Sequence, residues 1–219
     1  MRAVAAKCRR SREKARMGSD GGVICTHKHT IPSSNTHIPC IVAGLTDRVD
    51  LLLNISAILG DGRTTPGPER SLASIDRDWL QKSLGVNLIG HVMVTQAFLP
   101  LLKGRRSSSL SKVMNMSARV GSIGDNRLGG WYSYRMSKAA LNQFTKTASL
   151  ELKRHRCAVI SMHPGTTNTP LSKPFQKNVA PQKLFPAWYS VYCMLNVLWS
   201  VCEDDTGKFF SYNCEEIEW

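Results

Sequence analysis

Short apolar runs alternate with longer helical stretches along this chain, and the pattern becomes clear from about residue 46. Continuous apolar runs at 50–59, 112–117 and 157–162 predict strands that are buried on both faces, and a shorter run at 208–212 predicts a last strand. Runs of this kind are typical of parallel sheets with helices on both sides.

Helical periodicity fills the stretches between these runs. Ser74 or Asp76 can cap a helix that continues to about residue 102 and kinks near Pro100. The stretch 133–154 is the clearest helix, and 181–202 is predicted to be the last one. Strands that alternate with helices in this way predict an α/β fold with a doubly wound parallel sheet.

Polar clusters follow the predicted strands at the points where the strands end. They are the stretch 54–57, Ser117 with the loop after it, and Pro164 and Gly165 with the threonines that follow. The carboxyl ends of parallel strands meet at one edge of a sheet, where ligands bind. We therefore expect these clusters to form one site.

Residues 1–45 do not follow the pattern, so we divide the chain into an irregular basic N-terminal segment, 1–45, and a folded domain, 46–219. The segment contains residue types that bind zinc, namely Cys25, His27, His29, His37 and Cys40. Their spacing matches no zinc motif, and we predict no metal site.

The net charge of +13 is concentrated at the N-terminus, where residues 1–16 hold seven basic residues against one acidic residue. Excess positive charge favours anionic partners such as nucleic acid. No aromatic residues are interleaved with the basic ones in this head, so nucleic-acid binding is the least favoured function and we expect none.

The cysteines give a prediction about the compartment. There are seven, without a C-x-x-C pair, and no signal peptide is visible. Both features favour free thiols and a cytoplasmic location, with organelle targeting by the arginine-rich head as the alternative. No apolar run reaches the roughly 18 residues of a membrane-spanning helix, so we predict no span.

Tyr134 and Lys138 form the sharpest chemical feature. They are four residues apart and share one face of the predicted helix 133–154. A free phenol has a pKa near ~10, and a neighbouring ammonium lowers that pKa because it stabilises the phenolate. Such a phenol comes closer to the range that is useful for proton transfer. The same spacing also occurs in ordinary pairs of surface side chains. The motifs around it must therefore decide whether Tyr134 and Lys138 are a catalytic pair or a surface pair.

The motifs from about residue 50 onward together resemble the short-chain dehydrogenases/reductases. Asn54-Ile-Ser-Ala57 is similar to the family's Asn-Asn-Ala-Gly motif, and Asn87 falls at its helix asparagine. Asn115-Met-Ser117 resembles its serine strand, and the pair Tyr134 and Lys138 resembles its catalytic pair. The loop 164–169 resembles the one that closes on nicotinamide. The stretches 117–123 and 129–142 and the tail 205–219 are most similar to the C-factor-like or sniffer-like carbonyl reductase branch.

The resemblance implies a Rossmann-like sheet and a set of roles. Tyr134 would act as the general acid/base, with Lys138 lowering its pKa and holding the nicotinamide ribose. Ser117 would polarise the substrate carbonyl, and Asn87 would hold a water in a proton relay. The cofactor-binding residues implied in this way are Arg9, Asn54, Ser56, Ala57, Tyr134, Lys138, Pro164, Gly165, Thr167 and Thr169, with Thr169 contacting the carboxamide.

Two departures from the family pattern affect these roles. Many relatives have Ser-Ser where this chain has Ser117 and Ala118, so Ser122 is the alternative to Ser117 as the polarising group. The glycine-rich phosphate turn and the first strand have no room before residues 3–9, which look like the family's second strand. The predicted sheet is therefore N-terminally truncated.

The resemblance favours NADP over NAD, because Arg9 follows the apparent second strand at the place where a basic residue matches the 2′-phosphate. The leading function is an NADP-dependent oxidoreductase acting on a small carbonyl or alcohol substrate, as a homo-oligomer. The alternative is a truncated, non-catalytic pseudoenzyme that acts through protein contacts.

Overall fold

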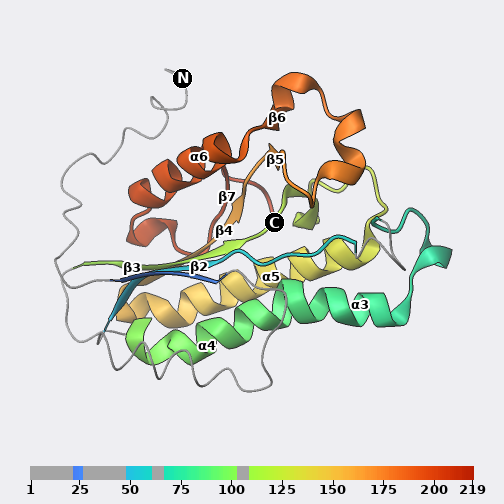
Figure 1. Ribbon diagram of the computed structural model, residues 1–219. Coiled ribbons are helices and arrows are strands. Elements are labelled where there is room, and N and C mark those ends of the chain that lie inside the picture. The colour runs from blue at the N-terminus through green and yellow to red at the C-terminus, as the bar shows by residue number, and fades with distance from the viewer. Residues whose placement is uncertain (1–21, 27–47, 61–66, 103–108) are drawn as a thin grey trace.

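A five-stranded parallel sheet forms the centre of the protein (Figure 1). The structure is a computed structural model, and it describes residues 22–26, 48–60, 67–102 and 109–219. The strands lie in the order β1-β2-β3-β4-β7, and each neighbouring pair is parallel. Their bounds are β1 (Gly22–Thr26), β2 (Val49–Asn54), β3 (Ser111–Met116), β4 (Cys157–His163) and β7 (Phe209–Ser211).

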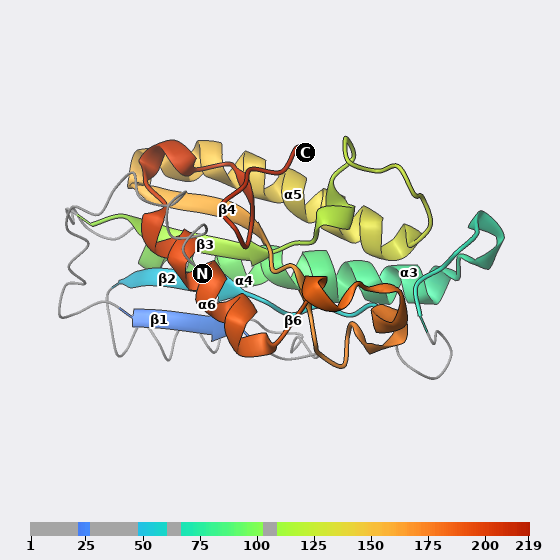
Figure 2. The ribbon, with the colours of Figure 1, turned by 90° about the horizontal axis from the view of Figure 1, so that it is seen from above.

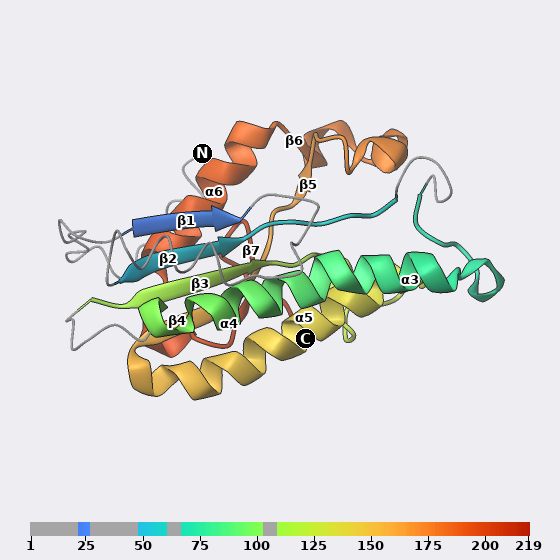
Figure 3. The ribbon, with the colours of Figure 1, turned by 60° about the horizontal axis from the view of Figure 1, so that its bottom comes forward.

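Helices cover both faces of this sheet. The helices α3 (Arg77–Leu84), α4 (Gly90–Leu102) and α5 (Tyr132–Leu152) lie on one side, and α6 (Ala187–Ser200) lies on the other (Figure 1). Seen from below, α5 runs beside α3 and the turn that follows α3 (Figure 3). Two short strands, β5 (Thr166–Thr167) and β6 (Leu184–Phe185), pair outside the main sheet. The predicted doubly wound α/β fold is confirmed.

Alternate residues of each strand enter two separate cores. Leu52, Val113 and Val159 face the α4 side, where Phe98 and Leu102 are buried among them. On the other face, strand residues pack beneath α6; this second core includes Leu51, Met114, Ile160, Met162, Met194, Val197 and Leu198. Because both faces are covered, the strands read as continuous apolar runs rather than as alternating ones.

Strand β1 was not predicted from the sequence. It lies in the segment 1–45 and pairs with β2, with Val23 opposite Leu51 and Thr26 opposite Asn54 (Figure 2). A run of five residues is too short to show periodicity, and the edge of β2 supplies hydrogen-bond partners for it that lie more than twenty residues further along the chain. The strand remnant predicted at 3–9 lies outside the described residues.

Two helix predictions need correction. The predicted single helix up to residue 102 is divided into α3 and α4 by a π-helical turn, Gly85–Ile89, and Pro100 lies inside α4. The last helix begins at Ala187 rather than 181, because Pro186 stands at its N-cap. A residue before proline is disfavoured in a helix, and Phe185 accordingly lies in β6.

By length and composition alone, the stretch Arg77–Leu102 would pass as a membrane span. In the structure its residues Phe98, Leu101 and Leu102 are buried against the sheet. A core helix of a soluble fold meets the same criteria, so this stretch is weak evidence for a membrane location.

The cysteines with described side chains fall into two groups. Cys157, Cys193 and Cys202 are free thiols, and burial raises the pKa of Cys157 to about 12. Cys214 takes part in a disulfide, so the expectation of free thiols is wrong at this position. Spacing along the chain could not show this, because a disulfide can join residues that are distant in sequence.

Hydrogen-bonded polar side chains cross the sheet on the face toward α4 and α5. The Asn54 amide donates to Asn115 Oδ1 at 2.9 Å, and Asn115 Nδ2 donates to Thr145 Oγ1 on α5 at 3.0 Å. Ser161 Oγ donates to the same threonine oxygen at 2.9 Å. All four residues are buried, so the network fixes α5 against β2, β3 and β4.

Replacing Asn115 should therefore destabilise the folded protein. Asn115→Leu leaves the Asn54 amide without one acceptor and Thr145 without one donor, and we expect the free energy of unfolding to fall by about 2–3 kcal/mol. Urea denaturation measures the change. The matched control is Asn178→Ala at an exposed position, where we expect a change within about 0.5 kcal/mol. Equal effects of the two variants would contradict the importance of the network.

Candidate functional site

Tyr134 and Lys138 lie together in the first turns of α5. Tyr134 is 8 % exposed and Lys138 is fully buried. The Lys138 ammonium nitrogen is 5.7 Å from the centre of the Tyr134 ring and donates a hydrogen bond to the Met116 carbonyl at 2.7 Å. Met116 ends β3, so the pair stands at the carboxyl edge of the sheet, where the sequence predicts a site.

Burial dominates the titration of both side chains. It raises the pKa of the Tyr134 phenol above its usual range, and it lowers the pKa of Lys138 to about 7. The sequence predicts the opposite direction for the phenol, because it weighs the charge of the ammonium but not the loss of water around the ring. At neutral pH the phenol therefore keeps its proton.

The Lys138 ammonium has unused hydrogen-bonding capacity. It carries three N–H groups, and the Met116 carbonyl is its one hydrogen-bond acceptor among the described residues. The Tyr134 hydroxyl likewise has no hydrogen-bond partner in the described part of the chain. A buried cation with free donors beside a phenol fits the ribose hydroxyls of a nicotinamide cofactor, which can accept hydrogen bonds there.

Asn87 lies in the π-helical turn and is fully buried. Its Oδ1 accepts from Ile58 N at 2.7 Å, and its Nδ2 donates to Ile58 O at 2.9 Å and to Ser137 Oγ at 3.1 Å. The amide thus joins the segment after β2 to α5 beside Lys138. Its Nδ2 donors are used by protein groups, and its Oδ1 accepts one hydrogen bond.

His91 is a residue of this region that the sequence reasoning missed. It lies one helical turn after Asn87, and its Nε2 is 2.8 Å from the Ser56 carbonyl. A carbonyl can only accept, so Nε2 carries the proton. Burial and the charge of Lys138 lower the His91 pKa to about 3, so the ring is neutral. In the sequence, His91 stands four residues after Asn87, and this helical spacing could have identified it as a neighbour of the site.

The strand predicted at 50–59 is shorter in the structure, where β2 ends at Asn54. Beyond Asn54, the backbone is bonded by Asn87 and His91 of the helical layer instead of by a neighbouring strand. Asn54 itself is buried in the polar network, whereas Ser56 and Ala57 are half-buried in the segment that follows.

The two serine candidates are both buried, and their hydroxyls are used differently. Ser117 Oγ donates to Asn142 Oδ1 of α5 at 2.7 Å, so its proton is committed. Ser122 Oγ accepts from Asp125 N at 3.0 Å. In this arrangement Ser117 holds α5 to the end of β3 rather than presenting a free proton.

The loop after β4 turns at Gly165, which has φ +74°. A side chain there would approach the Phe185 ring to 2.8 Å, so glycine is required by space as well as by conformation. Ser190 Oγ of α6 donates to the Pro164 carbonyl at 2.7 Å. Thr167 and Thr169 follow at this edge of the sheet, half-buried. Arg9, the remaining predicted contact, lies outside the described residues.

Glu69 is a second residue that sequence reasoning missed. Its buried carboxylate accepts hydrogen bonds from both the backbone N–H and the hydroxyl of Ser133, in the first turn of α5. Trp131, at the N-cap position, makes no side-chain cap. Glu69 therefore caps the helix from a distant loop, where a negative charge is favourable.

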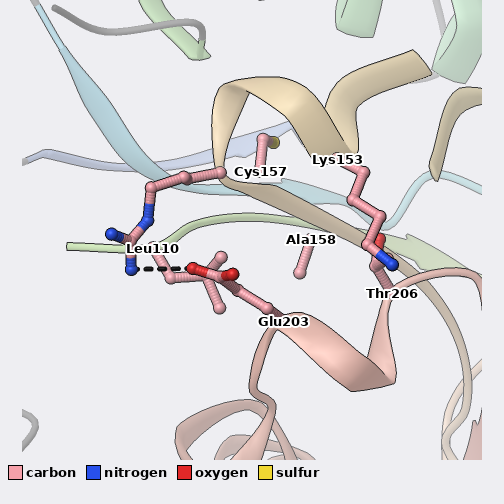
Figure 4. Close-up of a pocket in the computed structure, with 7 residues that line it drawn as sticks. Leu110, Lys153, Cys157, Ala158, Glu203 and Thr206 are labelled. Carbon is pink, nitrogen blue, oxygen red and sulfur yellow. Dashed lines mark ion pairs between the residues drawn. The ribbon is translucent and has the colours of Figure 1, made fainter. Parts of the chain in front are cut away.

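A shallow surface pocket lies at the opposite edge of the sheet, where β3 and β4 begin (Figure 4). Two of its lining residues, Arg156 and Glu203, form an ion pair at 2.7 Å. This pocket is therefore separate from the site around Tyr134, which lies at the carboxyl ends of the strands.

Known proteins resemble both the sequence and the fold. The model of the short chain dehydrogenase family matches residues 35–180. C-signal of Myxococcus xanthus is 32% identical over 174 residues, which cover 80% of this chain and 95% of that protein. A 1-hydroxy-2-glutathionyl-2-methyl-3-butene dehydrogenase of Rhodococcus sp. (strain AD45) is 36% identical over 104 residues, 48% of this chain and 44% of that one.

Two solved structures share the architecture. The NADPH-bound carbonyl reductase from chicken fatty liver matches with a TM-score of 0.75 and 27% identity, over 90% of this chain and 77% of that one. Carbonyl reductase Sniffer of D. melanogaster matches with a TM-score of 0.73 and 25% identity, over 84% and 73%. The class of the protein is thus an α/β oxidoreductase. The chain belongs to the short-chain dehydrogenase family, in the branch of the C-factor-like and sniffer-like carbonyl reductases.

Removing the distant cap should loosen the start of α5. We expect Glu69→Ala to lower the free energy of unfolding by about 1–2 kcal/mol, as loss of a helix cap does. Thermal and urea denaturation measure it. The control is Glu203→Ala, which removes a half-exposed ion pair and should change stability by about 0.5 kcal/mol or less. The cap is refuted if Glu69→Ala is no worse than this control.

The lowered pKa of Lys138 predicts a pH-dependent stability. The pKa is about 7 in the folded protein against 10.5 for the ordinary side chain, so between these values the unfolded chain binds more protons. Stability therefore rises with pH over this window. Lys138→Met should remove this component of the slope and raise the free energy of unfolding at pH 7, by on the order of 1–3 kcal/mol. Denaturation curves from pH 6 to 9 measure both effects, with exposed Lys177→Met as the control that keeps the slope.

Proposed function

We propose that this protein is an NADP-dependent oxidoreductase that interconverts a small carbonyl compound and its alcohol, with Tyr134 as general acid/base. The observation that carries the proposal is the buried pair of Tyr134 and Lys138 at the carboxyl edge of the sheet, in a chain of this family. An exposed surface pair would keep its water, whereas this pair is almost completely dehydrated.

The residues present fit the nicotinamide half of the cofactor. Lys138 would hold the ribose hydroxyls, and the loop with Thr167 and Thr169 would contact the nicotinamide, supported by Ser56 and Ala57 after β2. When bound, NADPH supplies the hydride. The similar chicken carbonyl reductase is NADPH-bound, which supports NADP, as does the sequence argument from Arg9.

The chain's own groups handle the proton. The phenol of Tyr134 is protonated at neutral pH and would donate its proton to the substrate oxygen in the direction of reduction. Burial raises its pKa and by itself makes it a weaker acid, so the transfer depends on a neighbouring positive charge. The charge of Lys138 then favours the phenolate that remains. A water relay through Asn87 would share its amide with the hydrogen bonds to Ile58 and Ser137. Ser117 could polarise the carbonyl only after releasing Asn142.

A non-catalytic remnant is the second candidate. In sequence, no glycine occurs between Thr26, the last residue of β1, and Gly44, so no glycine-rich phosphate turn follows that strand directly. In addition, Ala118 stands where many relatives have a serine. A chain of this kind would have the fold without saturable cofactor binding.

We also propose that the protein self-associates as a homo-oligomer. Large apolar side chains are exposed along α6, including Trp188 and Tyr192, which are 67 % and 62 % exposed. Light scattering coupled to gel filtration would measure the mass in solution, and a monomer at micromolar concentration would refute self-association.

Tyr134→Phe separates the two candidates. For an enzyme, we expect turnover of aldehydes with NADPH to fall by about 10²–10⁴-fold, because the proton donor is lost. The dissociation constant for NADPH, measured by fluorescence titration, should stay within about twofold, since no proton is transferred in binding. Exposed Tyr192→Phe is the matched control and should keep full activity. No saturable NADPH binding by the wild type would favour the remnant, and undiminished turnover by Tyr134→Phe would refute the role of the phenol.

A further inference from the structure

Trp131 has an unusual backbone conformation next to Tyr134. Its φ of 56° and ψ of 40° lie in the left-handed region, directly after Gly129 and Gly130, which both have φ +63°. A glycine adopts this conformation without strain, whereas a bulky side chain is rarely found there. Strain of this kind persists at functional sites when the surrounding structure enforces it.

Hydrogen bonds on both sides enforce the conformation. Trp131 N donates to the Glu69 carbonyl at 2.6 Å, and Arg135 N donates to the Trp131 carbonyl at 2.8 Å. The Arg135 side chain donates to the Gly130 carbonyl at 3.0 Å and to the Val120 carbonyl at 3.1 Å. The backbone is thus fixed, and the direction of the indole ring is set with it.

The indole ring links Tyr134 to a segment that is distant in sequence. It meets the Tyr134 ring edge to face, with centroids 6.3 Å apart, and packs against the Phe175 ring at 5.0 Å. Phe175 belongs to the 3₁₀-helical segment Lys173–Asn178, which follows the loop with Gly165. Trp131 and Phe175 are both half-buried, so neither residue is fully enclosed by the protein.

We propose that Trp131 is a specificity-determining residue: its ring and that of Phe175 form an apolar wall for the flat substituent of the substrate. The substrate class is then carbonyl compounds whose carbonyl carbon carries an aromatic or conjugated group, positioned so that the oxygen reaches the Tyr134 hydroxyl. Aromatic rings gain from offset or edge-to-face contact beyond the area they bury, which saturated rings of the same size do not. The inference rests on the proposed function and narrows it.

The test compares two aldehydes of similar size, benzaldehyde and cyclohexanecarbaldehyde, as substrates with NADPH. We expect the wild type to prefer benzaldehyde by about 3–10-fold in kcat/KM, in line with the extra contact energy of aromatic pairs. Trp131→Ala should reduce this ratio to about 1, Trp131→Phe should keep most of it, and Phe175→Ala should lower it in part. Trp188→Ala, at an exposed tryptophan on α6, should leave the ratio unchanged.

A purely structural Trp131 would give a different result. Its loss would lower the melting temperature and the rates with both aldehydes equally, so the ratio would stay constant. A constant ratio in Trp131→Ala, or no preference in the wild type, would overturn the proposal.

A binding experiment separates this proposal from the proposed function. Saturation-transfer NMR with benzyl alcohol as the probe needs no turnover and can be recorded on the protein alone. We expect binding by the wild type and by Tyr134→Phe, and its loss in Trp131→Ala. Binding with this pattern but without turnover of either aldehyde would refute the proposed function and leave the apolar wall in place. Equal binding by the wild type and Trp131→Ala would refute the wall.

Discussion

The burial of polar groups between the sheet and α5 is the constraint on which the rest of this structure depends. A buried ammonium or amide is costly unless its hydrogen bonds are made, so the position of α5 is set by acceptors on the strands. Lys138 takes the carbonyl at the end of β3, and Thr145 takes the amide of Asn115. Between these anchors the backbone of Gly121 lies so close to Lys138 that a Cβ would come within 2.7 Å of its side chain. The same contacts that hold the helix thus remove water from the ammonium and bring its pKa close to neutrality.

A second consequence concerns the segment after β2, which pairs with no strand in the part of the chain that the structure describes. Asn87 and His91, one turn apart on the helical layer, bond its backbone at Ile58 and Ser56. The π-helical turn at Gly85–Ile89 contains Asn87, and such turns often occur at functional sites. The neutral state of His91 matters here, because only the tautomer with its proton on Nε2 can donate to a carbonyl. The charge of Lys138 supports that state by disfavouring a second cation.

The start of α5 combines strain with compensation. The helix begins at a left-handed tryptophan without a capping side chain, and the carboxylate of Glu69 supplies the cap from a loop more than sixty residues earlier. Arg135 binds the two preceding carbonyls of the turn, at Gly129 and Gly130. These interactions hold Trp131 beside Tyr134, although an unstrained turn would place its ring elsewhere.

The sequence alone determined the layers of this protein and the identity of its reactive pair. Continuous apolar runs require strands covered on both faces, and residues four apart on a helix must share a face, so the parallel sheet and the neighbourhood of Tyr134 and Lys138 follow from local periodicity. Only the tertiary structure decided which groups are dehydrated and which hydrogen bonds they make. It reversed the expected pKa shift of the phenol, committed the proton of Ser117 to Asn142, and brought Glu69, His91 and Phe175 to the site from separate parts of the chain. Desolvation and long-range hydrogen bonding depend on distances through space, and spacing along a chain carries no information about them.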